Sequence, residues 1–586
     1  MTNKNSPIIL GMVYGAHDTA AALMVGGELV AACEQERCNF EKHTRAFPNE
    51  AIAECLARGG FTLSDVDEIA FCNDPMHYIR ETYLKLALEE DYRIGVMIDD
   101  FDRIKRAYQM EELVRKETGF EGPIEFHLHH MCHVASAYYP SGFDDALLAC
   151  YDGMGEIQTG LLAGGKDGDI EVLDASGRYP HSLGLLYSGI THFLGFKHHC
   201  DEGIVMGLAP YGDADAISPD GARTYYEVFE DIVQETGYYS YEVNLDWFVY
   251  HKVRDIWISD KFTDLFGPVR KWEDEITDVH KNVAAALQRR LEVIVLKQLR
   301  RAREEFGYRK LALSGGVALN CSMNGKIAAS GIFDEIFVQP ASGDSGTAIG
   351  ACYLSHKRMT PQFKPKKHHN FYLGTASGDD VRASAEAETG VHLQKQDNIY
   401  EFTAKRLAEG KIIAWFQDGA EFGPRALGNR SILTRPYPAE MKDYLNERVK
   451  FREPFRPFAP AILSDHLEEY FDIRQESPHM LIACQVQPEK RDEIPATVHV
   501  DGSCRVQSVK PTNNENFRAL LEAFYAETGC PVLLNTSFNV KGQPIVNTPE
   551  QAMRCFESTN IDVLVIGDCA AEKSPGTPES VDAAAD

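Results

Sequence analysis

The sequence has no apolar segment long enough to cross a membrane and no cysteine pattern typical of a secreted or zinc-binding module. No uninterrupted apolar run approaches the ~20 residues that span a bilayer. The first residues, Met1 to Pro7, lack the apolar stretch and cleavage site of a signal peptide. The 14 cysteines are scattered without any Cys-x-x-Cys pair, which favours reduced thiols. We therefore expect a cytoplasmic protein with no membrane partner.

Positive charge is also scarce. The 88 acidic residues outnumber the 59 lysines and arginines, so the formal net charge is −29. A large nucleic-acid footprint needs a basic face, and this balance disfavours a nucleic-acid partner. No Gly-x-x-x-x-Gly-Lys-Ser/Thr loop occurs, which excludes a typical P-loop enzyme. Basic residues do gather locally, at Arg425, Arg430, Lys450, Arg452 and Arg456.

The length of the chain and a repeated pattern indicate its organisation. A chain of 586 residues exceeds the size of one hydrophobic core, so at least two domains are expected. Two stretches share a strand–turn–hairpin plan. Their strands are expected over residues 8–13, 21–25 and 28–33, and again over 146–151, 159–163 and 170–173. Glycine pairs, Gly26-Gly27 and Gly164-Gly165, mark the expected hairpin turns, and the repeat predicts an internal duplication.

Two strand–glycine–helix units follow, at residues 310–317 and 336–354. Each predicts backbone N–H groups at the carboxyl end of a strand, where α/β folds bind phosphates. Residues 213–300 are expected to be mostly helical and without a chemical motif. The expected divisions are a first domain over 1–355, a linker over 356–372, a second α/β domain over 373–570 and a disordered tail over 571–586.

A histidine-rich segment, His129-His130-Met131-Cys132-His133, is the first candidate site. On a helix, His129 and His133 lie one turn apart and can meet one metal. Asp152, at a strand end, and Asp344, in a glycine-rich loop, can add oxygen ligands. Such a ligand set, which leaves coordination positions of the metal open, suits iron, zinc or manganese. The alternatives are a surface helix start for the histidines, a turn role for Asp152 and a helix cap for Asp344.

The second candidate site is basic. Lys450 and Arg452, two positions apart on an expected extended segment, point the same way and can grip a phosphate. Ser537 and Asn539 repeat that spacing with neutral donors. Arg425, Arg456 and Arg505 are further cations for the same cradle. The alternative for each cation is a solvated surface charge, although Phe451, Phe455 and Phe458 between them favour a packed segment.

Several longer motifs carry a resemblance. They are Glu36-Arg37 with Lys42-His43, the His129/His133 and Asp152 set, residues 182–187 (SLGLLY), 206–212 (MGLAPYG), 314–320 (SGGVALN), 423–428 (GPRALG) and 534–539 (LNTSFN). Through these motifs nearly the whole chain, from His17-Asp18 to about Asp568, resembles the O-carbamoyltransferases of antibiotic and nodulation-factor biosynthesis.

The resemblance implies a fold and a reaction. The first domain would be a duplicated actin/hexokinase-like (ASKHA) α/β domain similar to the tRNA threonylcarbamoyl-transferase subunit. The second would be an α/β twisted-sheet domain similar to threonylcarbamoyl-adenylate synthase, whose K-x-R and S-x-N motifs match Lys450/Arg452 and Ser537/Asn539. That domain would form carbamoyl-adenylate from carbamoyl phosphate and ATP with Mg²⁺. The first domain would then pass the carbamoyl group to a hydroxyl of a small-molecule acceptor.

The same resemblance implies residue roles. Fe(II) or a similar divalent metal at His129, His133, Asp152 and Asp344 would neutralise the adenylate phosphate. His17 would be a general base or an oxyanion stabiliser, with a simple turn residue as the alternative, and Lys42 would stabilise anionic charge. Gly315, Gly316 and Asn320 would hold the AMP part. The second domain's pocket would be lined by Arg425, Lys450, Arg452, Arg456, Met480, Arg505, Asn535, Ser537 and Asn539, with a core role as the alternative for Met480.

One position departs from the pattern, and two other functions stay open. Ile204 stands where the family commonly carries lysine. The first alternative function is threonylcarbamoyl transfer to tRNA, which the acidic charge disfavours. The second is a non-metabolic actin-like ATPase or scaffold, since fold alone does not determine function. The basic cradle argues against the scaffold, and the resemblance allows a homodimer.

Overall fold

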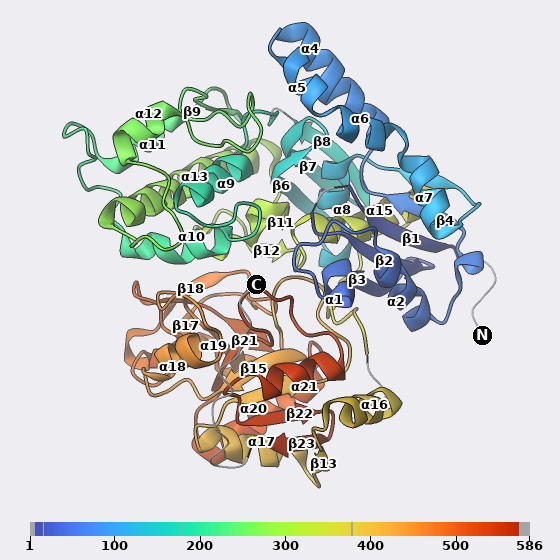
Figure 1. The fold of residues 1–586 in the computed structure, drawn as a ribbon, viewed down its shortest axis with the longest axis vertical. Helices are drawn as coiled ribbons and strands as arrows, with labels where there is room; N and C mark the ends of the chain where they lie inside the picture. Colours follow the sequence, from blue (N-terminus) through green and yellow to red (C-terminus); the bar gives the residue numbers. More distant parts are fainter. Residues whose placement is uncertain (1–5, 16, 176, 377–378, 574–586) are drawn as a thin grey trace. The chain divides into compact units, whose positions relative to one another are not determined.

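The computed structural model describes residues 6–15, 17–175, 177–376 and 379–573, and residue contacts divide the chain into two compact units (Figure 1). Unit 1 consists of Met1–Gln35, His43–His368 and Leu481–Ala483. Unit 2 consists of Glu36–Lys42, His369–Met480 and Cys484–Asp586. The boundary between residues 368 and 369 falls inside the expected linker. The segment Glu36–Lys42 joins unit 2 although it lies early in the sequence.

Unit 1 contains two five-stranded sheets with the same topology. The first has the order β3-β2-β1-β4-β5 and the second has the order β8-β7-β6-β11-β12. In each sheet three antiparallel strands are followed by two strands parallel to the first. The strands are β1 Ile8–Val13, β2 Ala20–Val25, β3 Glu28–Glu34, β4 Glu68–Phe71, β5 Ile124–Phe126, β6 Asp145–Gly155, β7 Gln158–Lys166, β8 Asp169–Asp174, β11 Lys310–Ser314 and β12 Glu335–Val338. The predicted duplication and α/β class are confirmed.

The hairpin turns explain one error in the predicted pattern. Gly26 and Gly27 form the β2–β3 turn with φ values of 59° and 87°, as a two-residue type I′ turn requires. In the second sheet the corresponding turn is Asp167-Gly168, with φ values of 54° and 93°, and not Gly164-Gly165. Those two glycines lie inside β7. No larger residue fits at these positions. A Cβ would come within 2.1 Å of the Tyr308 hydroxyl at Gly164 and within 2.6 Å of the Tyr138 ring at Gly165.

Two helices pack between the sheets of unit 1 (Figure 1). Helix α8, His129–Ser141, contacts β6 and β11, and helix α15, Thr347–Met359, contacts β1 and α8. Glycines permit this close packing. A Cβ on Gly11 of β1 would lie 2.1 Å from the Ala348 carbonyl oxygen, and one on Gly350 would lie 1.8 Å from that of Cys132. Because α15 runs to Met359, the first residues of the expected linker are helical.

The remaining helices of unit 1 surround this centre. A helical segment, called here the helical excursion, connects β4 to β5. It consists of α3 Pro75–Tyr78, the π-helix η2 Ile79–Lys85, α4 Leu86–Glu89, α5 Arg93–Asp99, α6 Phe101–Tyr108 and α7 Met110–Thr118. After β8 come α9 Leu183–Phe193, α10 Glu202–Leu208, α11 Tyr225–Ile232, β9 Val233–Glu235, β10 Tyr241–Val243, α12 Asp260–Phe266, α13 Asp278–Phe306 and α14 Cys321–Ala329. The prediction that residues 213–300 are mostly helical is wrong, because short strands and long irregular stretches separate α11, α12 and α13.

Unit 2 is built on one mixed eight-stranded sheet and a small three-stranded sheet. The order of the large sheet is β13-β23-β22-β14-β15-β21-β16-β20. Its strands are β13 Gln394–Lys395, β14 Ile413–Phe416, β15 Arg430–Thr434, β16 Ala459–Leu463, β20 Gln507–Val509, β21 Val532–Ser537, β22 Val563–Ile566 and β23 Cys569–Glu572. The small sheet consists of β17 Phe471–Asp472, β18 Ala483–Val486 and β19 Ser503–Arg505. Residues 571 and 572, expected to belong to a disordered tail, are part of β23. Residues 574–586 lie outside the described part.

Three helices of unit 2 begin at asparagine or threonine caps. Asn398 caps α17, Ile399–Ala408, and Asn514 caps α20, Glu515–Thr528, by accepting hydrogen bonds from main-chain N–H groups. Thr548 forms a capping box at α21, Pro549–Glu557. The other helices are α16 Asp379–Thr389, α18 Met441–Arg448 and α19 Leu467–Tyr470.

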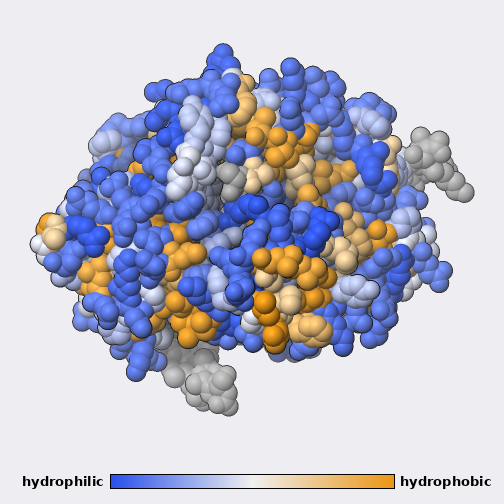
Figure 2. All heavy atoms as spheres, turned by 90° about the horizontal axis from the view of Figure 1, so that it is seen from above, coloured by the Kyte–Doolittle hydropathy of each residue, from blue (hydrophilic) through white to orange (hydrophobic). Residues whose placement is uncertain are grey.

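The surface is mostly polar. The face drawn in Figure 2 is largely hydrophilic with separate hydrophobic patches. On the helical excursion of unit 1, Leu88, Ile98, Phe101 and Tyr108 are exposed. Among the described residues, no helix combines the length and apolarity needed to cross a membrane.

Candidate metal centre and anion cradle

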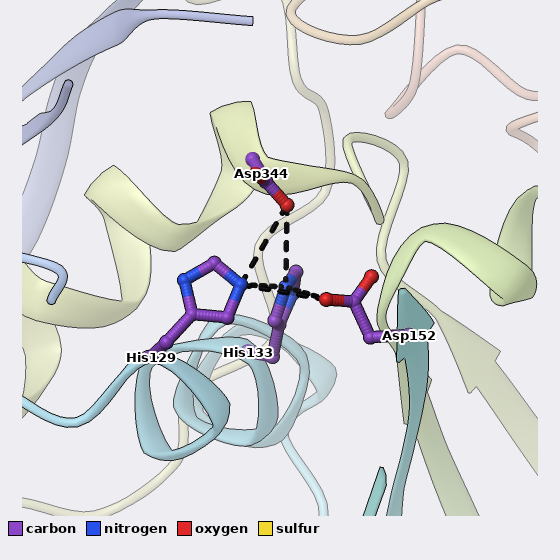
Figure 3. Close-up of side chains that lie close together, drawn as sticks. All are labelled: His129, His133, Asp152 and Asp344. Atoms are coloured by element: carbon purple, nitrogen blue, oxygen red, sulfur yellow. Dashed lines mark hydrogen bonds and ion pairs between the residues drawn. The ribbon is translucent and has the colours of Figure 1, made fainter. Parts of the chain in front are cut away.

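Four side chains from three separate segments of unit 1 converge (Figure 3). His129 and His133 project from the first turns of α8, Asp152 from β6, and Asp344 from the loop before α15. The helix supplies the one-turn spacing that the sequence predicts, and the sheet and loop bring the two carboxylates to it. The imidazoles and Asp152 are buried, while Asp344 is partly buried. The structure therefore brings together all four predicted ligands.

The distances within this cluster are at or slightly above those expected for ligands of one divalent ion. The Nε2 atoms of His129 and His133 are 3.0 Å apart. Both nitrogens lie 3.5–3.7 Å from Asp152 Oδ2 and 3.6–3.8 Å from Asp344 Oδ1. Atoms bound to one ion at ~2.0–2.2 Å are separated by about 3.0–3.5 Å in octahedral or tetrahedral geometry. Two imidazole nitrogens and two carboxylate oxygens are also a donor set suited to iron, zinc or manganese.

Without an ion, protons compensate the charges of this cluster. Burial would lower the pKa of His129, but hydrogen bonds to Asp152 and Asp344 outweigh it and raise that pKa well above its usual value. Burial likewise opposes ionisation of Asp344, yet His129 holds the pKa of this carboxyl well below its usual range. A bound cation would replace the protonated His129 imidazole as the positive partner of the two carboxylates.

The loop predicted to hold AMP also orders a metal ligand. The Gly316 N–H donates to Asp152 Oδ1 at 2.8 Å. Gly315 has a φ of 89°, and a Cβ there would lie 2.2 Å from the Tyr151 carbonyl oxygen. Asn320 caps α14 by accepting from Met323 N–H, and its amide exchanges hydrogen bonds with Gln288. Asn320 thus has a structural task, and nucleotide binding by these three residues stays a prediction.

His17 belongs to a histidine–aspartate–histidine arrangement. Asp18 Oδ2 lies 2.8 Å from His17 Nδ1, and Asp18 Oδ1 lies 2.7 Å from His43 Nδ1. The His17 ring also stacks on His199 at a centroid distance of 5.4 Å. Asp18 and His43 have φ values of 58° and 55°, so both occupy the left-handed region that non-glycine residues rarely adopt.

The environment raises the pKa of both imidazoles. Burial would lower the pKa of His17, but the hydrogen bond to Asp18 and the charge of Asp344 raise it to about 9. Burial is outweighed in the same way at His43, where Asp18 and Cys200 raise the pKa to about 10. Both rings are protonated at neutral pH, which favours stabilisation of anionic charge by His17 over acceptance of a proton.

Lys42 lies in a different unit from these residues. It is exposed and belongs to unit 2, where its charge lowers the pKa of Lys450. Its predicted role beside the metal cluster of unit 1 therefore stays a prediction. The neighbouring Arg37 is also part of unit 2 and donates to the Gly423 carbonyl oxygen at 2.7 Å.

In unit 2 the two predicted short motifs meet. Lys450 Nζ donates to the carbonyl oxygens of Ser537 and Asn539 at 2.7 and 2.9 Å, and it lies 3.2 Å from Ser537 Oγ and 2.6 Å from Asn539 Oδ1. The segment is not an extended strand as expected, because Phe451 has a φ of 48° and reverses the backbone after Lys450. Phe451 is exposed, whereas Phe458 is buried against the Arg452 guanidinium.

Lys450 is surrounded by neutral oxygens and by other cations. Burial, with the charges of Arg452 and Arg456, lowers the pKa of Lys450 well below its usual value. Burial, with Arg456 and Arg505, does the same to the pKa of Arg452. Arg452 Nε donates to Asn446 at 2.8 Å, but within the described chain Arg452 Nη2 and Arg505 Nε are buried without a hydrogen-bond partner. Arg456 pairs with Glu453 at 3.5 Å. These groups form a cationic cradle suited to an anion.

Other predicted members of this cradle differ in their surroundings. Arg425 is partly buried. The Asn535 amide donates to the Gln507 side chain at 2.9 Å and to the Ala426 carbonyl oxygen at 3.3 Å, so it joins β21 to the 423–428 loop. Met480 is 2% exposed and packs with Leu427 and Ala459, which favours its core alternative. Arg430, part of the basic cluster in the sequence, is fully buried and donates to main-chain carbonyl oxygens, including those of Asn429 and Asp418.

Sequence reasoning missed several residues that build these sites. Asp18, His43 and His199 surround His17, although His43 was visible as the neighbour of Lys42. Glu421 is another. Its buried carboxylate accepts from the N–H groups of Leu427, Asn429 and Arg430 at 2.7, 2.8 and 3.1 Å and closes the 421–430 loop. A single glutamate two residues before a glycine gives no sequence signal for such a role.

Family models match most of the chain. One described as carbamoyltransferase N-terminus matches residues 8–353, and one described as carbamoyltransferase C-terminus matches residues 404–573. The first includes all four residues of the metal cluster, and the second includes Lys450, Arg452, Ser537 and Asn539.

Individual relatives span nearly all of the chain. An uncharacterized protein of Synechocystis sp. is 37% identical over 95% of each chain. Nodulation protein NolNO of Sinorhizobium fredii is 37% identical over 96% of this chain and 80% of its own. A 3'-hydroxymethylcephem-O-carbamoyltransferase of Streptomyces clavuligerus is 32% identical over 63% of this chain and 64% of its own. Among solved structures, T. kodakarensis HypF aligns with 62% of this chain and 49% of that chain, with 12% identity and a TM-score of 0.33.

Proposed function

Because this chain belongs to the carbamoyltransferase family, we propose that it is an ATP-dependent O-carbamoyltransferase that works through carbamoyl-adenylate. Unit 2 would form carbamoyl-adenylate from carbamoyl phosphate and ATP, with Mg²⁺ on the nucleotide. Unit 1 would transfer the carbamoyl group to a hydroxyl of a small molecule, with release of AMP. Atom balance requires one water in the first step, because the products are carbamoyl-adenylate, inorganic phosphate and pyrophosphate.

This proposal rests on one observation: Lys450 donates hydrogen bonds to Ser537 and Asn539 within the buried cationic cradle that it forms with Arg452 and Arg505. Three cations near one another in a buried site destabilise one another, and an anionic ligand would relieve that repulsion. The free guanidinium N–H groups of Arg452 and Arg505 are donors for phosphate oxygens. A cradle of this kind supports binding of polyphosphate and carbamoyl phosphate in unit 2.

In unit 1, His129, His133, Asp152 and Asp344 would hold a divalent metal. When bound, such an ion neutralises phosphate charge and makes AMP a better leaving group. His17, kept protonated by Asp18, would stabilise the developing negative charge during attack by the acceptor hydroxyl. The Gly316 N–H holds Asp152 in place as the metal ligand.

The first test is pyrophosphate release from ATP by the full chain, with and without carbamoyl phosphate and with no acceptor added. We expect release only when both substrates are present, and trapping of the product with hydroxylamine should yield hydroxyurea and AMP. Release that is independent of carbamoyl phosphate would contradict the proposed donor. Retention of the carbamoyl group by the protein without formation of AMP would contradict the adenylate.

A further inference from the structure

The turn between β6 and β7 contacts the first metal ligand in two ways. Glu156, in this turn, is buried, and both of its carboxylate oxygens lie 3.2 Å from the main-chain nitrogen of His129. The preceding residue packs against the side chain of the same histidine: a Cβ on Gly155 would lie 2.1 Å from His129 Cδ2. The turn therefore restrains both the backbone and the imidazole of His129.

The same strand also supplies a metal ligand. Asp152 lies on β6 three residues before Gly155, so β6 and its turn carry one ligand and support another. Since His129 is the first residue of α8, the Glu156 carboxylate lies at a helix N-terminus. There it accepts an N–H group that has no partner within the helix and interacts favourably with the helix dipole.

Further contacts hold Glu156 itself in place. Its Oε1 accepts from the Asp74 N–H at 3.0 Å, and its carbonyl oxygen accepts from the Thr82 hydroxyl at 2.7 Å. Glu156 has a φ of 46°, a left-handed conformation that costs a non-glycine residue free energy unless its surroundings enforce it. A turn that needed only to reverse the chain would be served better by glycine here.

We propose that Glu156, with Gly155, is a positioning element that sets His129 at the correct distance from Asp152 for metal binding. The inference rests on the metal site of the proposed function. Glu156 does not bind the ion. It acts on metal affinity through the main chain of His129, as residues outside the coordination sphere commonly do.

The test measures metal affinity directly. Wild type, Glu156→Gln, Glu156→Ala and Gly155→Ala would be titrated with Co²⁺ as a spectroscopic probe of tetrahedral and octahedral sites. We expect Co²⁺ to bind about 10–100-fold more weakly to Glu156→Ala, the range typical of residues that support metal ligands. Glu156→Gln keeps one acceptor oxygen and should weaken binding less. Gly155→Ala should shift the Co²⁺ absorption bands because the His129 ring must move.

The matched control is Asp167→Ala. Asp167 is also an acidic residue with positive φ in a hairpin turn of the same sheet, but it is exposed and pairs with Lys364 at 2.8 Å. Its substitution should leave Co²⁺ affinity unchanged. Should Glu156→Ala fail to fold, as judged by near-ultraviolet circular dichroism, Glu156→Gln carries the comparison.

The outcomes separate this inference from the proposed function. Unchanged Co²⁺ affinity and spectrum in folded Glu156 variants would overturn the positioning role, as would equal weakening in Asp167→Ala or a wild type that binds no Co²⁺ at His129. Pyrophosphate release depends on unit 2 and should persist in the Glu156 variants. Loss of Co²⁺ affinity in a chain whose wild type releases no pyrophosphate would support the positioning role while contradicting the carbamoyl-adenylate reaction.

Discussion

The two candidate sites are buried charged clusters that differ in the balance of their charges: the first pairs carboxylates with imidazoles, and the second gathers cations. In unit 1, two carboxylates face two imidazoles, so a proton or a cation can balance the charge. In unit 2, Lys450, Arg452 and Arg505 influence one another with few acidic partners nearby, and Lys450 is held by neutral oxygens instead. We therefore propose a cation as the ligand of the first site and an anion as the ligand of the second. This difference predicts distinct responses to substitution, ligand and pH.

Loss of the central cation of unit 2 should have the largest effect. Lys450→Met keeps the aliphatic stem but removes the charge, and we expect carbamoyl-phosphate-dependent pyrophosphate release to fall by about 10²–10³-fold or more. Steady-state pyrophosphate assays would measure this. Lys411→Met is the control, because Lys411 pairs with Asp562 at the surface of the same unit. Comparable losses in both variants would show that Lys450 has no special role.

Removal of a ligand in unit 1 should separate the two half-reactions. We expect His129→Ala to lose metal and to transfer the carbamoyl group at least about 10²-fold more slowly, while pyrophosphate release continues. Metal content by mass spectrometry and product formation with an acceptor would be measured on one preparation. His127→Ala is a nearby control, since His127 lies 2.8 Å from Ser355 outside the cluster. Normal transfer by His129→Ala would refute the metal role.

An anion should stabilise the folded protein through unit 2. Pyrophosphate at 100 times its Kd would raise the free energy of unfolding by about 2.7 kcal/mol if it binds only the folded state. Arg452→Met should lose this stabilisation, whereas Arg406→Met should keep it, because Arg406 pairs with Glu409 and Glu572 at the surface. Thermal unfolding with increasing pyrophosphate would test this. Undiminished stabilisation of Arg452→Met would place the anion elsewhere.

The histidine pair on Asp18 should make stability depend on pH. The pKa of His17 is raised to about 9 and that of His43 to about 10, above the value of about 6.5 expected in the unfolded chain. Their contribution is complete below pH ~6.5 and is lost as the pH rises through 9 to 10. Linkage over these two shifts sets an upper limit of about 8 kcal/mol, and solvent screening of the partly exposed rings reduces the stability expected to disappear between pH 6.5 and 10 to on the order of 2 kcal/mol.

Asp18→Asn tests this assignment. Asparagine keeps the size of the side chain but removes the charge that raises both pKa values, so the loss of stability over this alkaline range should become much smaller. Denaturant unfolding of wild type and variant at several pH values would measure it. Parallel pH profiles for the two proteins would contradict the assignment to Asp18.

The smallest effect is expected at Met480. Met480→Leu conserves apolar volume and should cost less than about 1.5 kcal/mol of stability. If Met480 serves only to pack against Leu427 and Ala459, the KM for ATP should not change. A KM increase of tenfold or more without loss of stability would instead favour the predicted place in the nucleotide pocket.

Local patterns account for the parts of these sites that the sequence could predict. The His129–His133 spacing needs only a helix, and α8 provides it. Asp152 lies on β6 and Asp344 follows β12, and both strands run parallel to β11, which lies between them, so the two aspartates come to the same edge of one sheet.

The errors arose where distant residues decide the local structure. Gly164 and Gly165 look like a turn, yet they are strand residues that make room for Tyr308 and Tyr138. Lys42 lies within the expected bounds of the first domain but groups with unit 2 by its contacts, and its catalytic role stays a prediction. Arg430 looks like a ligand-binding cation, yet main-chain carbonyl oxygens surround its guanidinium.

The sequence by itself determined the α/β class and the duplication and proposed the residues of the two candidate sites, because periodicity and short spacings are local properties of the chain and longer motifs carry a family resemblance. Only the tertiary structure decided that Lys450 meets Ser537 and Asn539, that Asp18 bridges two imidazoles, and that the Gly155-Glu156 turn supports His129. These contacts join residues far apart in sequence, and they depend on how helices and sheets pack. Packing is a property of the whole fold, so no single segment of the sequence reveals it.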